Sequence, residues 1–154
     1  MIMKNSIVWV IDTTVLCNIL DIPGRNQHRA SVINDFKMRI RSSHRFILPF
    51  TTVLETGNFI GQIKGEPDRR KKFATSLVDL LRKSVNGEVP WRTMEFPETN
   101  QVMTWLEENP FTNDAGKGVG FGDYLILRQT ESQRLKALGL EVYIWSLDGH
   151  LMGR

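Results

Sequence analysis

Four acidic residues from distant parts of the chain are placed to form a common site, since each follows an apolar run or begins a helix expected after one. They are Asp12, Glu55, Asp123 and Asp148. Carboxylates that converge repel one another and are costly to bury, so a pocket that holds several of them needs cations. Oxygen ligands favour Mg²⁺ or Mn²⁺ over zinc. With such ions the natural substrate is a phosphate ester, because a metal can polarise the phosphoryl group, generate a hydroxide nucleophile and stabilise the leaving oxygen.

Alternating strands and helices are expected to position these acids. The apolar runs at residues 6–11, 46–48 and 141–145 predict strands, and residues 91–96 could form a further one. Helical spacing of apolar residues predicts helices at 13–20, 28–41, 52–63, after Pro67 with Asp68 as N-cap, at 97–108 and at 123–138, with a glycine-rich loop at 109–122. The pattern indicates one α/β domain over residues 1–154, a three-layer α/β/α sandwich with a mainly parallel sheet. Sites in such folds lie beyond the carboxyl ends of the strands.

The size and composition of the chain fit this interpretation. Its 154 residues are 41% hydrophobic and 24% charged, which excludes a disordered chain or a disulfide-framework mini-protein. The single cysteine, Cys17, cannot form an intramolecular disulfide, which agrees with a reducing, cytoplasmic setting. The early apolar run of five residues is too short for a signal peptide or a membrane span, so we expect no membrane association.

The positive charge is concentrated in one part of the sequence. The net charge is only +3, but residues 25–72 carry 11 Lys and Arg against 4 acids, which gives +7. A basic segment beside clustered carboxylates suggests a surface that binds a polyanion, although solvated helix faces are the plain alternative. Within it, the run Arg69, Arg70, Lys71 and Lys72 is a candidate contact for nucleic-acid phosphates, and Lys117 of the glycine-rich loop is a second candidate.

Four segments, in order, resemble the motifs of PIN-domain ribonucleases, the family that includes VapC-like toxin nucleases. They are residues 8–16 (VWVIDTTVL), 48–55 (LPFTTVLE), 122–127 (GDYLIL) and 144–148 (IWSLD). The first is similar to a strand ending in Asp-x-Ser/Thr, and the second to a helix that supplies a Glu. The third is similar to an Asp followed by an apolar helix, and the fourth to Ser/Thr-x-Asp after a strand. The resemblance covers nearly the whole chain.

This resemblance implies a Mg²⁺- or Mn²⁺-dependent endoribonuclease that leaves 5′-phosphate and 3′-hydroxyl ends. Asp12, Glu55 and Asp123 would ligate the metal, with Asp148 as a fourth, less constant acid. Thr14 would orient Asp12 or the water, and Ser146 would support the pocket. Small PIN proteins of this length are often toxins, so an antitoxin partner and a homodimer are expected alongside the RNA substrate.

The chain also departs from the family pattern. Glu55 is followed by an unusual continuation, Thr56-Gly57-Asn58-Phe59, and Asp114 in the glycine-rich loop is an additional acid near Asp123. Only six residues follow Asp148, which leaves open whether the sheet has the family's last edge strand.

Each site residue also has a purely structural interpretation. Asp12 and Asp123 could be helix N-caps, and Thr52-x-x-Glu55 matches a capping box. Asp148-Gly149 is a good turn pair. The three histidines have no metal-binding spacing and are expected to be surface residues, and Cys17 is expected to be in the core.

Two other functions stay open at this stage. A non-catalytic PIN-like module would bind RNA or a protein partner without needing Asp12 or a metal. A phosphatase or receiver-type domain would use Asp12 as a nucleophile, but Thr14 stands where the usual Asp-x-Asp opening has its second acid.

Overall fold

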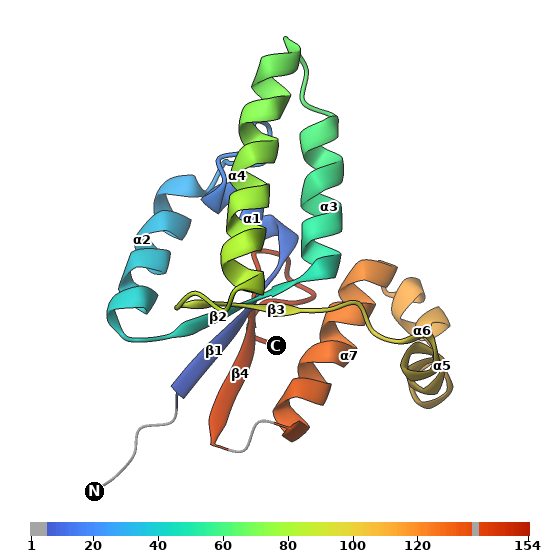
Figure 1. Cartoon of the computed structure of the whole chain (residues 1–154). Helices are drawn as coiled ribbons and strands as arrows, with labels where there is room; N and C mark the ends of the chain where they lie inside the picture. Colours follow the sequence, from blue (N-terminus) through green and yellow to red (C-terminus); the bar gives the residue numbers. More distant parts are fainter. Residues whose placement is uncertain (1–5, 137–138) are drawn as a thin grey trace, which may run out of the picture.

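The computed structural model describes residues 6–136 and 139–154, in which four parallel strands form one sheet between layers of helices (Figure 1). The strand order across the sheet is β3-β2-β1-β4. The strands are β1 (Ser6–Ile11), β2 (Arg45–Pro49), β3 (Trp91–Met94) and β4 (Leu140–Trp145). The helices are α1 (Thr13–Ile19), α2 (Arg29–Arg41), α3 (Phe50–Gly61), α4 (Pro67–Val85), α5 (Thr99–Glu108), α6 (Phe111–Gly116) and α7 (Phe121–Lys136). The predicted α/β sandwich with a parallel sheet is confirmed.

Both faces of the sheet carry an apolar core, because alternate residues of a strand point to opposite faces. On one face Ile11 and Phe46 belong to a cluster that α1, α2, α3 and α4 complete. On the other face Val10 and Ile144 pack with Ile126 and Leu127 of α7. The continuous apolar runs read from the sequence are therefore strands buried on both sides.

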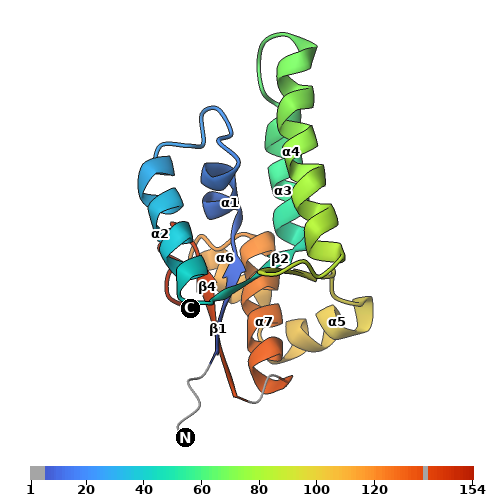
Figure 2. The same ribbon diagram turned by 60° about the vertical axis from the view of Figure 1, so that its left-hand side comes forward.

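The helices of the two layers differ in their arrangement. In both views α3 and α4 lie side by side as a hairpin that extends beyond the sheet, whereas α5 and α6 lie next to α7 (Figures 1 and 2). In the part of the chain that the structure describes, no helix is both long and apolar enough to cross a membrane.

Parallel pairing brings the first and last strands together and aligns their ends. Ile11, the last residue of β1, is in register with Trp145, the last residue of β4. The backbone N–H of Asp12 continues this pairing by donating to the carbonyl of Trp145 (3.1 Å). The residues that follow the two strands therefore start from neighbouring points on one edge of the sheet.

Several predicted boundaries are wrong for identifiable reasons. The loop expected at 109–122 contains the short helix α6, which begins after Pro110 and whose Phe111 packs edge-on against Phe121 and Tyr124 (centroids 5.1 and 5.5 Å). Proline presets the helical φ angle, and the aromatic cluster supplies the packing that glycine content alone would not suggest.

The start of α4 also differs. Helix α4 begins at Pro67 itself, with Glu66 as the N-cap residue, so Asp68 lies inside the first turn and is not the predicted cap. A proline suits the first helical position, and an acidic residue there is favoured by the helix dipole.

Other boundaries shift by a few residues. Helix α5 begins at Thr99, two residues after the predicted start. The predicted last residues of the helix at 123–138 fall on 137–138, outside the described residues. Residues 146–154 form turns without a further strand.

Candidate active site

A cavity of about 410 Å³ lies at the carboxyl edge of the sheet, where β1 and β4 end. The acids that line it come from four separate elements and are the four proposed from the sequence: Asp12, Glu55, Asp123 and Asp148. Thr14 also lines it, whereas Ser146 lies behind Asp12. Parallel strands thus bring together residues that are up to 136 positions apart.

The carboxylate of Asp12 is held by a network of hydroxyl groups. Asp12 is only 2% exposed. Its Oδ2 accepts hydrogen bonds from the hydroxyls of Ser146 (2.7 Å) and Thr14 (2.8 Å) and a longer one from the Thr14 backbone N–H (3.4 Å). The hydroxyl oxygens accept in turn from the backbone, Thr14 from Leu147 N (2.9 Å) and Ser146 from Asp148 N (2.9 Å). Because these backbone donors orient both hydroxyls, their protons point to Asp12.

Asp12 both lines the cavity and caps a helix. It is the N-cap residue of α1, as its bond from the Thr14 N–H indicates. The capping hydrogen bond goes to Oδ2, the same oxygen that accepts from the two hydroxyls. Oδ1 therefore stays available for a ligand.

Glu55 does not belong to a capping box. Helix α3 begins at Phe50 with Pro49 as its N-cap, so Glu55 is the sixth helical residue and Thr52 bonds instead to the carbonyl of Ile11 (2.8 Å). The Glu55 Oε1 atom is buried and has no hydrogen-bond partner among the described residues. Burial, and next the charge of Asp12, raise the pKa of Glu55 above its ordinary value.

Helix α7 approaches Glu55 closely at a glycine. A Cβ atom added to Gly122 would lie 2.5 Å from Glu55 Oε1, closer than side chains allow. The helix begins at Phe121, so Asp123 is its third residue and not the N-cap considered from the sequence. The small Gly122 thus lets α7 place Asp123 beside α3.

Asp123 is the most strongly perturbed acid of the group. Burial, followed by the charges of Asp12, Asp148 and Glu55, raises its pKa to about 7. The helix dipole acts in the opposite direction, because a negative charge is favoured in the first turn. Loss of solvent and like-charge repulsion outweigh both the dipole and the charge of His150, so positive charge near Asp123 does not compensate the acids.

Asp148 also forms the turn expected of it. Its Oδ1 accepts from the backbone N–H of His150 (2.9 Å), and its carbonyl accepts from Leu151 and Met152. Asp148 nevertheless lines the cavity, so the turn is compatible with the site predicted from the sequence.

The donor set fits a hard divalent cation. It consists of carboxylate oxygens, one of them buried and without a partner among the described residues, in a group whose charges raise the pKa of Asp123 and Glu55. Among the residues described, however, no three His, Cys, Asp or Glu side chains are arranged to hold an ion together. The arrangement therefore suits an ion bound through one or two carboxylates and otherwise through water, as is usual for Mg²⁺.

Comparisons with known proteins agree with the architecture. No protein-family model and no curated protein matches the sequence. A chain of the crystal structure of VapBC2 from Rickettsia felis bound to a DNA fragment from their promoter aligns with 90% of this chain and 99% of its own length, at a TM-score of 0.53 and 14% identity. The fold is PIN-like. At this identity the similarity extends to the fold and no further.

Within the PIN-like fold, the predicted RNA contacts do not line the cavity. Arg69 and Arg70 bind the carbonyls of the turn before α4, at Lys64 (2.9 Å) and at Ile63 and Gly65 (3.0 and 3.1 Å). Lys71 lies 3.9 Å from Asp68, and Lys72 lies beside the ring of Phe73. Lys117 is the C-cap of α6, and Asp114 also lies outside the cavity lining.

Sequence reasoning missed several polar residues that line the cavity, among them Arg25, Gln27 and His28. These three belong to the connection between α1 and α2, which has no distinctive motif. The one sequence feature that marked this connection was Pro23-Gly24, which indicates a loop between the two helices but not that the loop lines the cavity. Cys17 lies in the core, as expected, and burial raises its pKa to about 11.

Proposed function

We propose that this protein is a Mg²⁺- or Mn²⁺-dependent endoribonuclease. The observation that carries the proposal is the convergence of Asp12, Glu55, Asp123 and Asp148 on one cavity at the carboxyl edge of the sheet. The fold similarity to a chain of a VapBC2 structure supports the same class of protein.

The side chains have separable tasks in this proposal. Asp12 is oriented through Oδ2 and offers Oδ1 to the cavity, and Glu55 offers its buried Oε1. When bound, the divalent ion supplies charge neutralisation and polarises the phosphoryl oxygen. Asp123, whose pKa is raised to about 7, holds its proton more readily than an ordinary Asp and would release it to solvent when positive charge enters the site.

The biological setting is proposed on the same basis. The similar chain comes from a VapBC2 structure, and we propose that the present protein acts as a toxin held by an antitoxin protein, as a homodimer. A cytoplasmic location agrees with the single cysteine, which is buried in the core.

The test is cleavage of labelled RNA by the unsubstituted protein and by Asp12→Asn, each with Mg²⁺ or with EDTA. We expect cleavage only by the unsubstituted protein with Mg²⁺, and products with 5′-phosphate ends. Asp114→Asn is a matched control, because it removes one acid outside the cavity lining and should cleave normally. Cleavage of equal rate in all four arms would instead identify a contaminating nuclease and contradict the proposal.

A non-catalytic RNA-binding module is the second candidate. It is favoured by the finding that, in the described ranges, no three potential ligands are arranged around a common ion. It predicts RNA binding that persists in EDTA and in Asp12→Asn, with no cleavage in any arm. Mg²⁺-dependent cleavage that Asp12→Asn abolishes would exclude it.

A further inference from the structure

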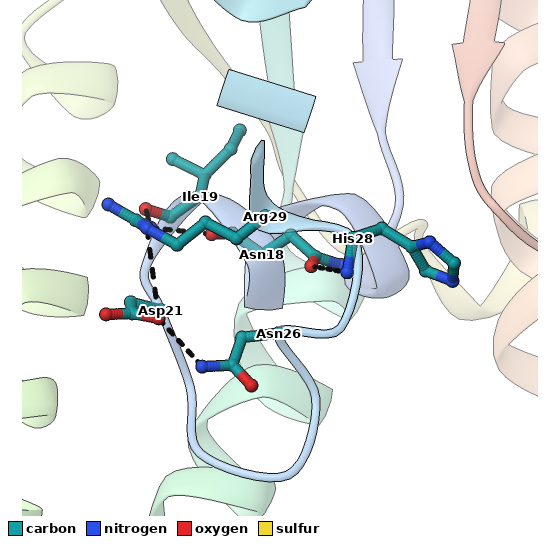
Figure 3. Close-up of polar contacts among 6 residues, drawn as sticks. All are labelled: Asn18, Ile19, Asp21, Asn26, His28 and Arg29. Atoms are coloured by element: carbon teal, nitrogen blue, oxygen red, sulfur yellow. Dashed lines mark hydrogen bonds and ion pairs between the residues drawn. The ribbon is translucent and has the colours of Figure 1, made fainter. Parts of the chain in front are cut away.

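The connection between α1 and α2, residues 20–28, is a built wall of the cavity. At its base the Asn18 side chain donates to the carbonyl of Thr14 (2.8 Å) and accepts from the backbone N–H of His28 (2.9 Å). Asn18 is 3% exposed, so both bonds are shielded from water. The imidazole of His28 points away from this polar cluster (Figure 3).

Arg29 ties the same connection to the end of α1. Its Nη1 donates to the carbonyls of Asn18 and Ile19 (2.7 Å each), and its Nε lies 3.8 Å from Asp21, which also accepts from Asn26 (2.8 Å; Figure 3). The guanidinium is thus used to satisfy helix carbonyls, and Arg29 does not line the cavity.

Arg25 is held in a different way. Its guanidinium carbon lies 3.4 Å from the centre of the Phe59 ring, on α3 across the cavity wall. Among the described residues that line the cavity, Arg25 is the only one with a Lys or Arg side chain. Within that described part of the chain its side chain has neither a hydrogen bond nor an ion pair, so stacking alone fixes it.

We propose that Arg25, fixed on Phe59, binds a backbone phosphate of RNA next to the phosphodiester that faces the carboxylates. The inference rests on the proposed function and adds where the substrate is held. The carboxylate centre repels a polyanion, and Arg25 supplies positive charge on the rim of the same cavity. A guanidinium stacked on a ring keeps its N–H groups in the plane, where they can bind two phosphate oxygens at once.

A phosphate contact positions a strand without reading its bases. The proposal therefore predicts that Arg25 contributes equally to RNAs of different sequence. It also predicts that Phe59 acts as a positioning residue, because it orients the guanidinium without touching the substrate.

The experiment measures the affinity of short fluorescein-labelled single-stranded RNAs by anisotropy over a range of salt concentrations. All proteins carry Asp12→Asn, which keeps the RNA intact. For Arg25→Gln we expect about a tenfold weaker affinity and a salt slope smaller by about 0.7, as for the loss of one phosphate contact to a single strand. Phe59→Leu, which keeps an apolar side chain but not the ring, should weaken binding less and in the same direction.

Two matched variants remove the same charge elsewhere. Arg82→Gln lies on the last turn of α4, where Arg82 is 75% exposed, and should leave binding unchanged. An equal or larger loss of affinity from Arg69→Gln than from Arg25→Gln would overturn the proposal and move the RNA contact to the start of α4.

The remaining outcomes separate this proposal from the proposed function. Strong RNA binding that does not change in Arg25→Gln overturns the Arg25 assignment alone. The absence of RNA binding by every variant, together with no cleavage by the unsubstituted protein, overturns the proposed function as well.

Discussion

The two oxygens of the Asp12 carboxylate have different surroundings. Oδ2 accepts from two hydroxyls and a backbone N–H, whereas Oδ1 accepts no hydrogen bond among the described residues, and Asp12 lines the cavity. The hydroxyls belong to Thr14 and Ser146, and each takes its orientation from the backbone of residues 147–148. An acid that is oriented through one oxygen can present the other at a fixed angle, which is what a metal ligand requires.

We expect Ser146→Ala to lower the rate of RNA cleavage by about 10- to 100-fold, because outer partners of ligating groups have effects of this size. The substitution removes a donor to Asp12 Oδ2 and leaves the Asp148 N–H without its acceptor. Steady-state kinetics and thermal unfolding should be measured on the same samples.

Two further variants separate positioning from general destabilisation. Ser146→Thr keeps the hydroxyl and should restore most of the rate. Ser76→Ala, which removes an exposed hydroxyl on α4, should behave as the unsubstituted protein. An unchanged rate in Ser146→Ala would contradict the orienting role.

The elements could be predicted where a local pattern is sufficient to define them. The run at 6–11 is a buried strand, and the helical spacing at 28–41 is α2 with its start shifted to Arg29. Helix α6 was missed because its stability comes from Phe111 packing on α7, a tertiary contact. The start of α3 was placed two residues late, since Pro49 makes a strand end and a helix start adjacent.

The residues of the candidate site could be predicted only where a local sequence pattern marks them. The four acids were identified from their positions after strands and from the ordered resemblance to family motifs. Arg25 could not be identified, because its position depends on a ring 34 residues away in the sequence. Conversely, the run of basic residues at 69–72 looks like a polyanion contact in the sequence, yet it lies outside the cavity lining.

The close approach of helix α7 to helix α3 at Gly122 can be tested by substitution. We expect Gly122→Ala to displace Glu55, because the new Cβ would lie 2.5 Å from Glu55 Oε1. A misplacement of about 1 Å at a catalytic group can cost about 100-fold in rate, so cleavage should fall strongly. The matched control is Gly120→Ala, whose added Cβ would have no neighbour within 4 Å. Equal rates in the two variants would show that the approach of α7 does not position Glu55.

The whole molecule uses much of its positive charge internally. Arg39 lies between the rings of Trp9 and Trp145, with its guanidinium carbon 3.9 Å from each ring centre. Arg29 and Arg70 satisfy backbone carbonyls. The net charge of +7 over residues 25–72 therefore overstates the number of cationic side chains that are available to a ligand.

The uncompensated acids predict a pH-dependent stability of the metal-free protein. The pKa of Asp123 is about 7 in the folded chain against an ordinary value of 3.8, so between these pH values the folded state binds more protons than the unfolded state. Asp123 therefore contributes a fall in the free energy of unfolding as the pH rises from about 4 to about 7. We expect Asp123→Asn to remove part of this fall and to be more stable at pH 7.5 by about 1 kcal/mol after allowance for solvent screening, or about 3 °C in Tm.

Thermal unfolding in EDTA at pH 5 and pH 7.5 measures this difference. Added Mg²⁺ should raise the Tm of the unsubstituted protein at pH 7.5 more than that of Asp123→Asn, since the ion replaces the proton as the source of positive charge. Parallel pH profiles for the two proteins would contradict the raised pKa.

The pairing of β1 with β4 also has a consequence for protein synthesis. One of the two hydroxyls that orient Asp12 comes from Ser146, 134 positions later. Ser146 directly follows β4, which is made after all the other described helices and strands. A nascent chain that does not yet include β4 and Ser146 therefore carries only an unfinished pocket. If the pocket cleaves RNA, a nascent chain does not cleave the messenger being read before β4 and Ser146 have emerged.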